Sequence, residues 1–405
     1  MAVHAPVCSD IAVKYLRLHL ADAVGPVLLG RLIRHFDSID GVLSASMAEL
    51  CEVEGIGERR SRSILESRGD EAALTEIEKA TEAGIRIICW EDAEYPTQLR
   101  HCDDPPICLY VRGKLEREDA VAVAIVGSRH CTHYGLEQSR RFASLLAGAG
   151  FTVVSGLARG IDGHAHEGAL AAGGRTVAVL GSGVNVIYPP EHDELARRIM
   201  TAGAVISEDP IDSAPTTDSF PRRNRIIAGM SLGVIVIEAS HRSGALITAR
   251  LATEYNREVF AVPGRVDAKT SLGTNDMIRR GAAKLVARLE DVLEELGDVG
   301  RIMAEASSIP AERPPLGPAS LPGGLFADGD EGSLSTIHVS VATRAALTAD
   351  ERSIAECLAN EERHVDDLAI QTGLPAHKVA ACLTMLQIKG LVIGLPGSRY
   401  TLRSS

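Results

Sequence analysis

The sequence predicts an α/β protein built on a doubly wound parallel sheet with helices on both faces. In residues 121–129 (VAVAIVGSR), a β-branched apolar run ends at a glycine turn and apolar residues at helical spacing follow, a typical first strand–turn–helix unit. Further apolar runs lie at 151–155, 175–180, 204–208, 233–238 and 258–262. Because helical patterns alternate with these runs, we expect parallel strands joined by crossover helices.

Charge is distributed unevenly along the chain. The 405 residues carry a formal net charge of −12, whereas residues 121–290 contain 19 Lys and Arg against 16 Asp and Glu. An acidic chain is a poor general nucleic-acid binder, because such proteins usually carry a basic field. A mildly basic core between acidic flanks is compatible with one local anion-binding site.

The eight cysteines predict neither a metal site nor a disulfide framework, because no two of them form a CxxC pair. Scattered cysteines in a large chain indicate a reducing compartment. No apolar stretch approaches the roughly 18 residues of a membrane span. Charged residues and histidines interrupt the N-terminal apolar runs. We therefore expect no signal peptide, no membrane segment and a cytoplasmic protein.

Residues 1–70 predict a small helical domain, and residues 71–115 a connector that packs on the sheet. Within the first, residues 55–57 (GIG) separate two helical patterns and precede three arginines, as in a helix-hairpin-helix or SAM-like domain that brings backbone N–H groups to a DNA phosphate. An αα-corner whose glycines only turn the chain explains the same residues. The connector contains two expected strands, at 85–89 and 107–112.

Residues 116–297 form the predicted large domain, and four of its loops follow strands, at the edge where open α/β sheets bind ligands. Glycine turns before helices offer N–H groups to a phosphate, and arginine adds a fork of donors. We place the run 220–225 (FPRRNR) in an irregular stretch before a helix; its phenylalanine offers a ring for a base. The expected anion-binding residues are Gly127, Ser128, Arg129, Ser155, Gly156, Arg159, Gly160, Phe220, Arg222, Arg223, Asn224, Arg225, Ser243 and Gly244.

No catalytic constellation stands out in the large domain. Titratable residues follow several strands on different loops: His164, His166, Glu208 and Glu238. The two histidines share no helix face and no zinc signature, and Asp162 is expected to cap a helix. No GxGxxG motif opens the first helix. We expect no catalytic residue, no metal and no cofactor.

The composition changes twice beyond the large domain. Residues 298–346 are rich in Pro, Gly, Ser and Ala without a period, which is typical of a flexible linker. Residues 347–405 predict a helix, a helix-turn-helix and a β-hairpin, hence a winged helix. The basic residues of its third helix are His377, Lys378 and Lys389. Sequence-specific DNA readers usually have more phosphate contacts, so we expect contact with protein or weak contact with DNA.

The motifs GSR, SGxAxGID, FPRRNRIIAG, SGALITA, VPG and TNDMIRRGA occur in this order between residues 92 and 283. Together they resemble the DNA-processing protein A family (DprA, also called Smf), as do the flanking domains. The resemblance implies an extended Rossmann fold without catalytic activity that binds single-stranded DNA, protects incoming DNA and loads the RecA recombinase in natural transformation and recombination. It assigns DNA binding to Arg129, the turn 155–162, Phe220 and three polar residues: Arg223, Asn224 and Arg225.

The resemblance also implies a homodimer formed through the Rossmann domain. Residues 274–286 show a near-helical apolar pattern, and its candidate interface residues are Met277, Ile278 and Leu285. Packing of these residues on the sheet explains the pattern equally well. One family feature is missing: after Tyr188-Pro189 the chain has Pro, Glu and His where members often have Lys or Arg.

Two other functions stay open. A nucleotide-processing enzyme resembling the lysine-decarboxylase-like phosphoribohydrolases would carry a PGGxGTxxE loop, and residues 243–254 (SGALITARLATE) stand at a similar place without the double glycine. A regulator acting through the winged helix would need more arginine in its third helix. Binding of a single-stranded oligonucleotide, compared with nucleoside monophosphates, separates DNA binding from nucleotide processing.

Overall fold

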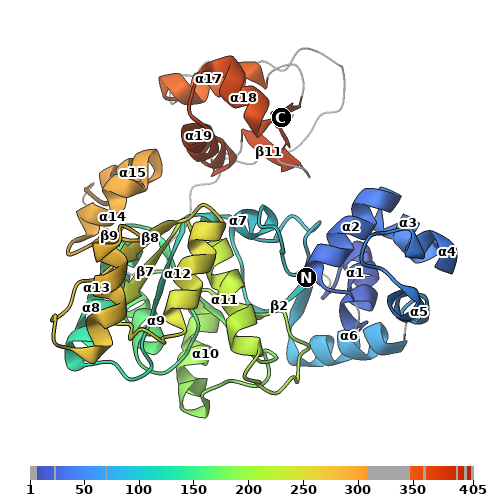
Figure 1. Ribbon diagram of the computed structural model, residues 1–405, viewed down its shortest axis with the longest axis horizontal. Coiled ribbons are helices and arrows are strands. Elements are labelled where there is room, and N and C mark those ends of the chain that lie inside the picture. The colour runs from blue at the N-terminus through green and yellow to red at the C-terminus, as the bar shows by residue number, and fades with distance from the viewer. Residues whose placement is uncertain are drawn as a thin grey trace, which may run out of the picture. The chain divides into compact units, whose positions relative to one another are not determined.

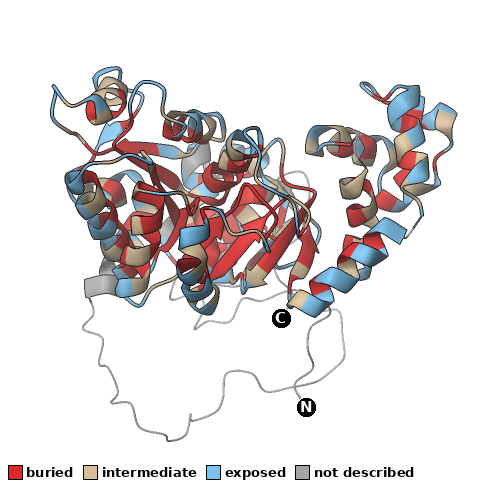
Figure 2. Ribbon diagram, turned by 90° about the horizontal axis from the view of Figure 1, so that it is seen from below, coloured by how far each residue is buried: buried red, intermediate tan, exposed pale blue. Residues whose placement is uncertain are grey.

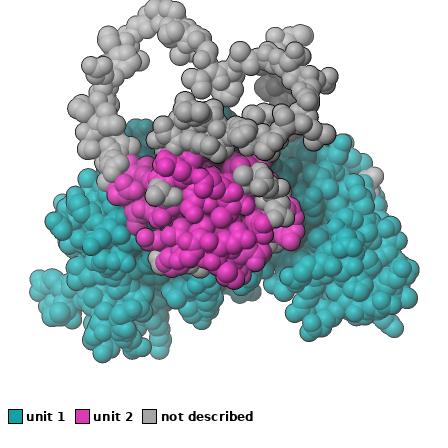
Figure 3. All heavy atoms as spheres, turned by 90° about the horizontal axis from the view of Figure 1, so that it is seen from above, with its two compact units in different colours: residues 1–296 teal, residues 297–405 magenta. Residues whose placement is uncertain are grey.

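The computed structural model describes residues 7–21, 24–69, 71–308, 347–358, 362–388, 391–395 and 399–402. The chain divides into two compact units, residues 1–296 and residues 297–405, which Figure 3 shows in different colours. Each unit is described separately below.

In the described part of the first unit, one sheet has nine strands in the order β1-β2-β6-β5-β4-β3-β7-β8-β9 (Figure 1). Their bounds are β1 Arg86–Cys89, β2 Cys108–Gly113, β3 Ala122–Gly127, β4 Thr152–Ser155, β5 Thr176–Val179, β6 Ala204–Ser207, β7 Gly233–Ile237, β8 Glu258–Ala261 and β9 Lys284–Leu285. Strands β3 to β8 are the six expected ones and are parallel. The expected connector strands extend the same sheet, and β2 pairs antiparallel with both β1 and β6.

Helices cover both faces of the sheet (Figure 1). They are α8 His133–Gly148, α9 Ile161–Ala171, α10 Asp193–Ala202, α11 Ser219–Met230, α12 Ala245–Glu254, α13 Leu272–Arg279 and α14 Leu289–Glu295. Alternate residues of β3, such as Ala122, Ala124 and Val126, join one core with buried residues of α11 and α12. Helix α10 belongs to a second core. None of the described helices has the length and apolar character of a membrane span.

Strands β3 and β7 lie side by side with Gly127 opposite Ile237, although β4, β5 and β6 come between them in the chain. The chain therefore reverses its direction of travel across the sheet between these two strands. In open α/β sheets, ligands bind outside the carboxyl ends of the strands at such a switch point. Figure 2 shows that the strands are buried, so functional side chains have to come from the loops at their ends.

The N-terminal region is helical, as expected. Its helices are α1 Asp10–Leu20, α2 Pro26–Phe36, α3 Ile39–Ser44, α4 Met47–Cys51, α5 Glu58–Glu66, α6 Glu71–Ala83 and α7 Thr97–Arg100. Gly55, between α4 and α5, has φ +88°, which favours glycine at this turn. Ile87 of β1 and Tyr110 of β2 belong to the core of the helical region, whereas their neighbours Ile88 and Leu109 belong to the sheet core. The alternation of strand side chains thus joins the two cores.

The second unit contains a winged helix with its own core. Its elements are α15 Gly297–Ser308, α17 Ala349–Cys357, β10 Arg363–His364, α18 Val365–Thr372, α19 Ala376–Ile388, β11 Val392–Leu395 and β12 Arg399–Leu402. The expected linker is wrong for residues 298–308, which are helical, and residues 309–346 lie outside the described residues. Lys389 and the expected turn at 396–397 also lie outside them.

Two expectations about local structure are wrong. The FPRRNR run does not precede a helix but lies inside α11, which begins at Ser219; the Ser219 and Thr216 side chains each accept a hydrogen bond from the other's backbone N–H at 3.1 Å. The near-helical pattern of 274–286 is interrupted, because α13 ends at Arg279 and Leu285 lies in the edge strand β9.

Candidate functional site

The GSR turn follows β3 directly and is locked to the end of β7. A Cβ on Gly127 would stand 1.9 Å from the carbonyl oxygen of Ile237, so only glycine fits there. The next amide, that of Ser128, donates to the carbonyl oxygen of Glu238 at 2.8 Å. The turn thus fixes where Arg129 leaves the sheet.

Glu238 connects the end of β7 to the start of α8. The residue is 4% exposed and has φ +49°. Its carboxylate accepts hydrogen bonds from the backbone N–H of Thr132 at 2.7 Å and from the Thr132 hydroxyl at 2.5 Å. Because Thr132 is the N-cap of α8, Glu238 ties the start of this helix to the end of β7.

The SGLARGID turn forms the opposite wall. The Ser155 hydroxyl donates to the carbonyl oxygen of Ile125 at 2.6 Å, and Gly160 has φ +75°. Asp162 does not cap its own helix as expected; it accepts a hydrogen bond from the backbone N–H of Gly156 at 3.2 Å. Burial raises the pKa of Asp162, and the charge of Arg223 opposes that shift. Asp162 therefore stabilises the SGLARGID turn to which it belongs.

Arg223 forms the floor between the two turns. It is 5% exposed, and its guanidinium donates to the carbonyl oxygen of Gly156 at 2.6 Å and to that of Val179. Burial lowers the pKa of Arg223 to about 10. Its neighbour Asn224 donates to the carbonyl oxygen of Gly244 at 3.4 Å, which links α11 to the turn before α12.

Arg129 stands over the ring of Phe220, with its guanidinium carbon 4.9 Å from the ring centroid, in a cation–π arrangement. Tyr188 lies against the same ring at a centroid distance of 5.8 Å. Arg129 has no ion pair with any described residue, although its charge acts to lower the pKa of Asp162. A guanidinium without an ion-pair partner beside aromatic rings suits an anionic, aromatic ligand.

These residues line an open cleft of about 340 Å³. From the expected set the cleft contains Gly127, Ser128, Arg129, Phe220, Arg223, Asn224, Ser243 and Gly244. A smaller hollow shares Arg129 and Phe220 with the cleft and adds Gly156 and Arg159. Arg159 is paired with Glu191 at 2.5 Å. The acid that follows the Tyr-Pro pair thus neutralises the charge of one arginine of the site.

Comparisons with known proteins agree with this geometry. Residues 86–297 match the family described as DNA recombination-mediator protein A, and residues 340–398 match the DprA winged helix domain. Protein Smf of Synechocystis sp. is 35% identical over 396 residues, covering 94% of this chain and 96% of that protein. The chain belongs to the DNA recombination-mediator protein A family.

Other DprA proteins support the same assignment. DNA processing protein DprA of Bacillus subtilis is 39% identical over 216 residues, which cover 53% of this chain and 72% of that protein. The X-ray structure of DprA from Streptococcus pneumoniae superposes with a TM-score of 0.63 at 33% identity, covering 70% of this chain and 97% of that one. The Rossmann-like sheet and the winged helix expected from the sequence are thereby confirmed.

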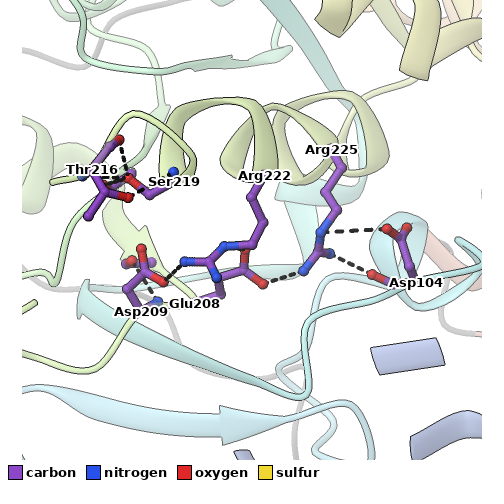
Figure 4. Close-up of polar contacts among 9 residues, drawn as sticks. Asp104, Glu208, Asp209, Thr216, Ser219, Arg222 and Arg225 are labelled. Atoms are coloured by element: carbon purple, nitrogen blue, oxygen red, sulfur yellow. Dashed lines mark hydrogen bonds and ion pairs between the residues drawn. The ribbon is translucent and has the colours of Figure 1, made fainter. Parts of the chain in front are cut away.

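Two arginines of the FPRRNR motif do not reach the cleft. Arg222 and Arg225 are not among the lining residues, and Figure 4 shows that they point toward acidic residues. Arg222 pairs with Glu208 at 3.2 Å and with Asp209, and Arg225 pairs with Glu208 and Asp104. The structure thus divides the run of arginines that the sequence analysis treated as one cluster.

Sequence analysis missed Ser240, which also lines the cleft. The signal for Ser240 was available, because it follows β7 at the same sheet edge as the GSR turn.

Among the described residues no cluster of three or more His, Cys, Asp or Glu could hold a metal. His166 is fully buried against Thr176, and burial lowers its pKa to about 3.

Proposed function

We propose that the first unit binds single-stranded DNA in the cleft between the GSR turn, the SGLARGID turn and α11. The observation that carries this proposal is Arg129, whose guanidinium has no ion pair with a described residue and stands over Phe220 at the carboxyl edge of the sheet. A phosphate bound there gains a charge-assisted, bidentate contact. The start of α12 beside Gly244 adds the positive end of a helix.

The aromatic rings favour a single strand over a duplex. Phe220 and Tyr188 offer ring surfaces, and a base can stack on a ring only when it is not already stacked within a helix. Stacking accepts every base, so we expect little sequence preference. The acidic net charge of −12 limits binding elsewhere on the chain.

Membership in the family supports a role in processing DNA during transformation and recombination. We extend this to protection of incoming DNA and to loading of the RecA recombinase in the cytoplasm, which the family resemblance implies.

A homodimer formed through the Rossmann-like part belongs to the same proposal. Leu285 is its best interface residue, because it is 46% exposed on the edge strand β9, whereas Met277 and Ile278 pack against the sheet core.

We propose further that the cleft binds without chemistry. The carboxylates of Asp162 and Glu238 are engaged in holding turns, and His166, on α9, is buried against Thr176. The alternative enzyme would need a catalytic Glu in 243–254, but Glu254 lies at the end of α12 and pairs with Arg250 at 3.3 Å. Incubation with labelled DNA, nucleotides and NAD should give no product.

The proposed function is tested by titrating fluorescent oligo-dT into the protein at several salt concentrations. The logarithm of affinity should fall linearly with that of salt, with a slope of about −0.7 per phosphate contact on a single strand. Blunt duplex and nucleoside monophosphates are the comparisons. A flat salt response, or equal affinity for duplex, would contradict the proposal.

A further inference from the structure

Helix α11 has two polar faces with different surroundings. Phe220, Arg223, Asn224 and Ile227 follow the spacing i, i+3, i+4, i+7, and all four line the cleft. Arg222 and Arg225, three residues apart, share another side of the helix. The orientation of α11 about its axis therefore decides which residues the cleft presents.

The side with Arg222 and Arg225 is held by a cluster of acids (Figure 4). The two carboxylate oxygens of Glu208 take one arginine each: Oε1 lies 3.2 Å from Arg222 Nε, and Oε2 bonds to Arg225. Arg225 also donates to the carbonyl oxygen of Asp104 at 2.5 Å. Arg225 and Glu208 are each 7% exposed. An acid that pairs with arginines on two successive turns of one helix restrains both the rotation and the position of that helix.

Glu208 is held in turn by the N-terminal helices. It follows β6, whose last residue, Ser207, stands opposite Tyr110 of β2. His19 of α1 is buried near the backbone of Glu208; burial lowers the pKa of His19 to about 4, so it is neutral there. Three residues further on, the amide of Ile211 donates to Glu76 of α6 at 2.8 Å. The helical region thus lies against Glu208 and is hydrogen-bonded to Ile211.

We propose that Arg222 and Arg225 are positioning residues, and that through Glu208 the N-terminal helical region holds α11 so that Phe220, Arg223 and Asn224 face the cleft. The inference rests on the proposed function for its effect on DNA, but the clamp itself exists without DNA. Its consequence is that the helical region supports DNA binding from outside the cleft.

The first test needs no DNA. Hydrogen exchange of the α11 amides is measured on the full chain for wild type and Glu208→Gln, which keeps the shape of the side chain and removes its charge. Exchange across 219–230 should become at least tenfold faster. The matched control is Glu167→Gln, which breaks the Arg140–Glu167 pair of 2.7 Å between α8 and α9 and should leave α11 unchanged. Unchanged exchange in Glu208→Gln would overturn the inference.

The second test separates positioning from phosphate contact. Arg222→Gln keeps Arg225 in place and, with Arg222 half-exposed, should fold even if Glu208→Gln does not. We expect oligo-dT affinity to fall three- to tenfold with an unchanged salt slope, because no phosphate contact is lost. In a double-mutant cycle, Arg222→Gln with Glu208→Gln should bind no worse than Glu208→Gln alone. A shallower salt slope in Arg222→Gln, or additive losses, would show that Arg222 touches DNA.

The outcomes distinguish this inference from the proposed function. If wild type does not bind oligo-dT but Glu208→Gln loosens α11, the clamp stands and the DNA site is wrong. If wild type binds with the expected salt slope but neither variant alters exchange or affinity, the clamp is wrong and the DNA site stands.

Discussion

Arg129 and Arg225 belong to two motifs of the same sheet edge, yet they have opposite surroundings. Arg129 has no ion pair among the described residues and stands over an aromatic ring. Arg225 is buried and shares two acids, Glu208 and Asp104. A buried cation with counterions contributes to the fold, whereas one without them can attract a phosphate. The number of arginines in a motif therefore says less about ligand binding than the position of their acids.

The largest effect should come from breaking the buried pair. Arg225→Met leaves Glu208 and Asp104 without their buried cation, and we expect the free energy of unfolding to fall by about 3–5 kcal/mol in urea denaturation. Arg129→Met is the matched control and should change it by less than about 0.5 kcal/mol. Equal losses in the two variants would remove the distinction between a structural and a binding arginine.

The next effect should appear in DNA affinity. Arg129→Ala removes a charge-assisted contact worth about 1.5–3 kcal/mol, which weakens oligo-dT binding about ten- to a hundredfold. The salt slope should become shallower by about 0.7. Arg140→Ala, at an exposed ion pair on α8, is the control and should bind like wild type. The comparison would be reversed if Arg140→Ala lost as much affinity as Arg129→Ala.

The buried imidazole of His166 extends the comparison to the effect of pH on stability. Burial lowers the pKa of His166 to about 3, below the ordinary value of 6.5, so only the unfolded chain takes up a proton between these values. The contribution of His166 to stability is thus present above pH 6.5 and is lost as pH falls.

Lowering the pH from 7 to 5 should therefore cost about 2 kcal/mol through His166 alone. Other groups titrate in the same range, so the measured quantity is the difference between wild type and His166→Gln in urea denaturation at both pH values. His166→Gln should lose about 2 kcal/mol less than wild type. Parallel pH profiles for the two proteins would show that His166 has the same pKa in the native and the unfolded state.

The smallest effect should come from the winged helix. Lys378 is exposed on α19, and an exposed lysine is a flexible point charge. We expect Lys378→Ala to weaken oligo-dT binding less than twofold at fixed salt, and to leave thermal unfolding unchanged. If Lys378→Ala weakens binding more than Arg129→Ala does, the DNA site lies in the winged helix.

The core of the fold could be predicted because its pattern is local. Strands β3 to β8 are β-branched apolar runs, and each is short and bounded by turn residues. The start of α11 was missed, although Pro221 lies in its first turn, where a proline loses no hydrogen bond. The reciprocal bonds between Thr216 and Ser219 order the turn before the helix, but the N-cap, Asp218, makes no side-chain cap hydrogen bond.

The division of the FPRRNR arginines could not be read from spacing alone. Its key residue, Glu208, follows β6, and its distance from α11 depends on how β6, β2 and α1 pack. Leu285 was similarly placed in a helix, although it forms a two-residue edge strand through pairing with β8. Both errors concern contacts between distant segments, which periodicity does not report.

The stack of Arg129 on Phe220 also bears on how quickly a strand can be handed on. The guanidinium covers one side of the Phe220 ring, so this side does not face water. An arriving base either replaces that guanidinium or lies on its outer side. The free energy gained by stacking is therefore the difference between two stacking contacts, and not the full free energy of one contact. A difference of this kind favours short residence times at each nucleotide. Such exchange agrees with the proposed transfer of the strand to a recombinase.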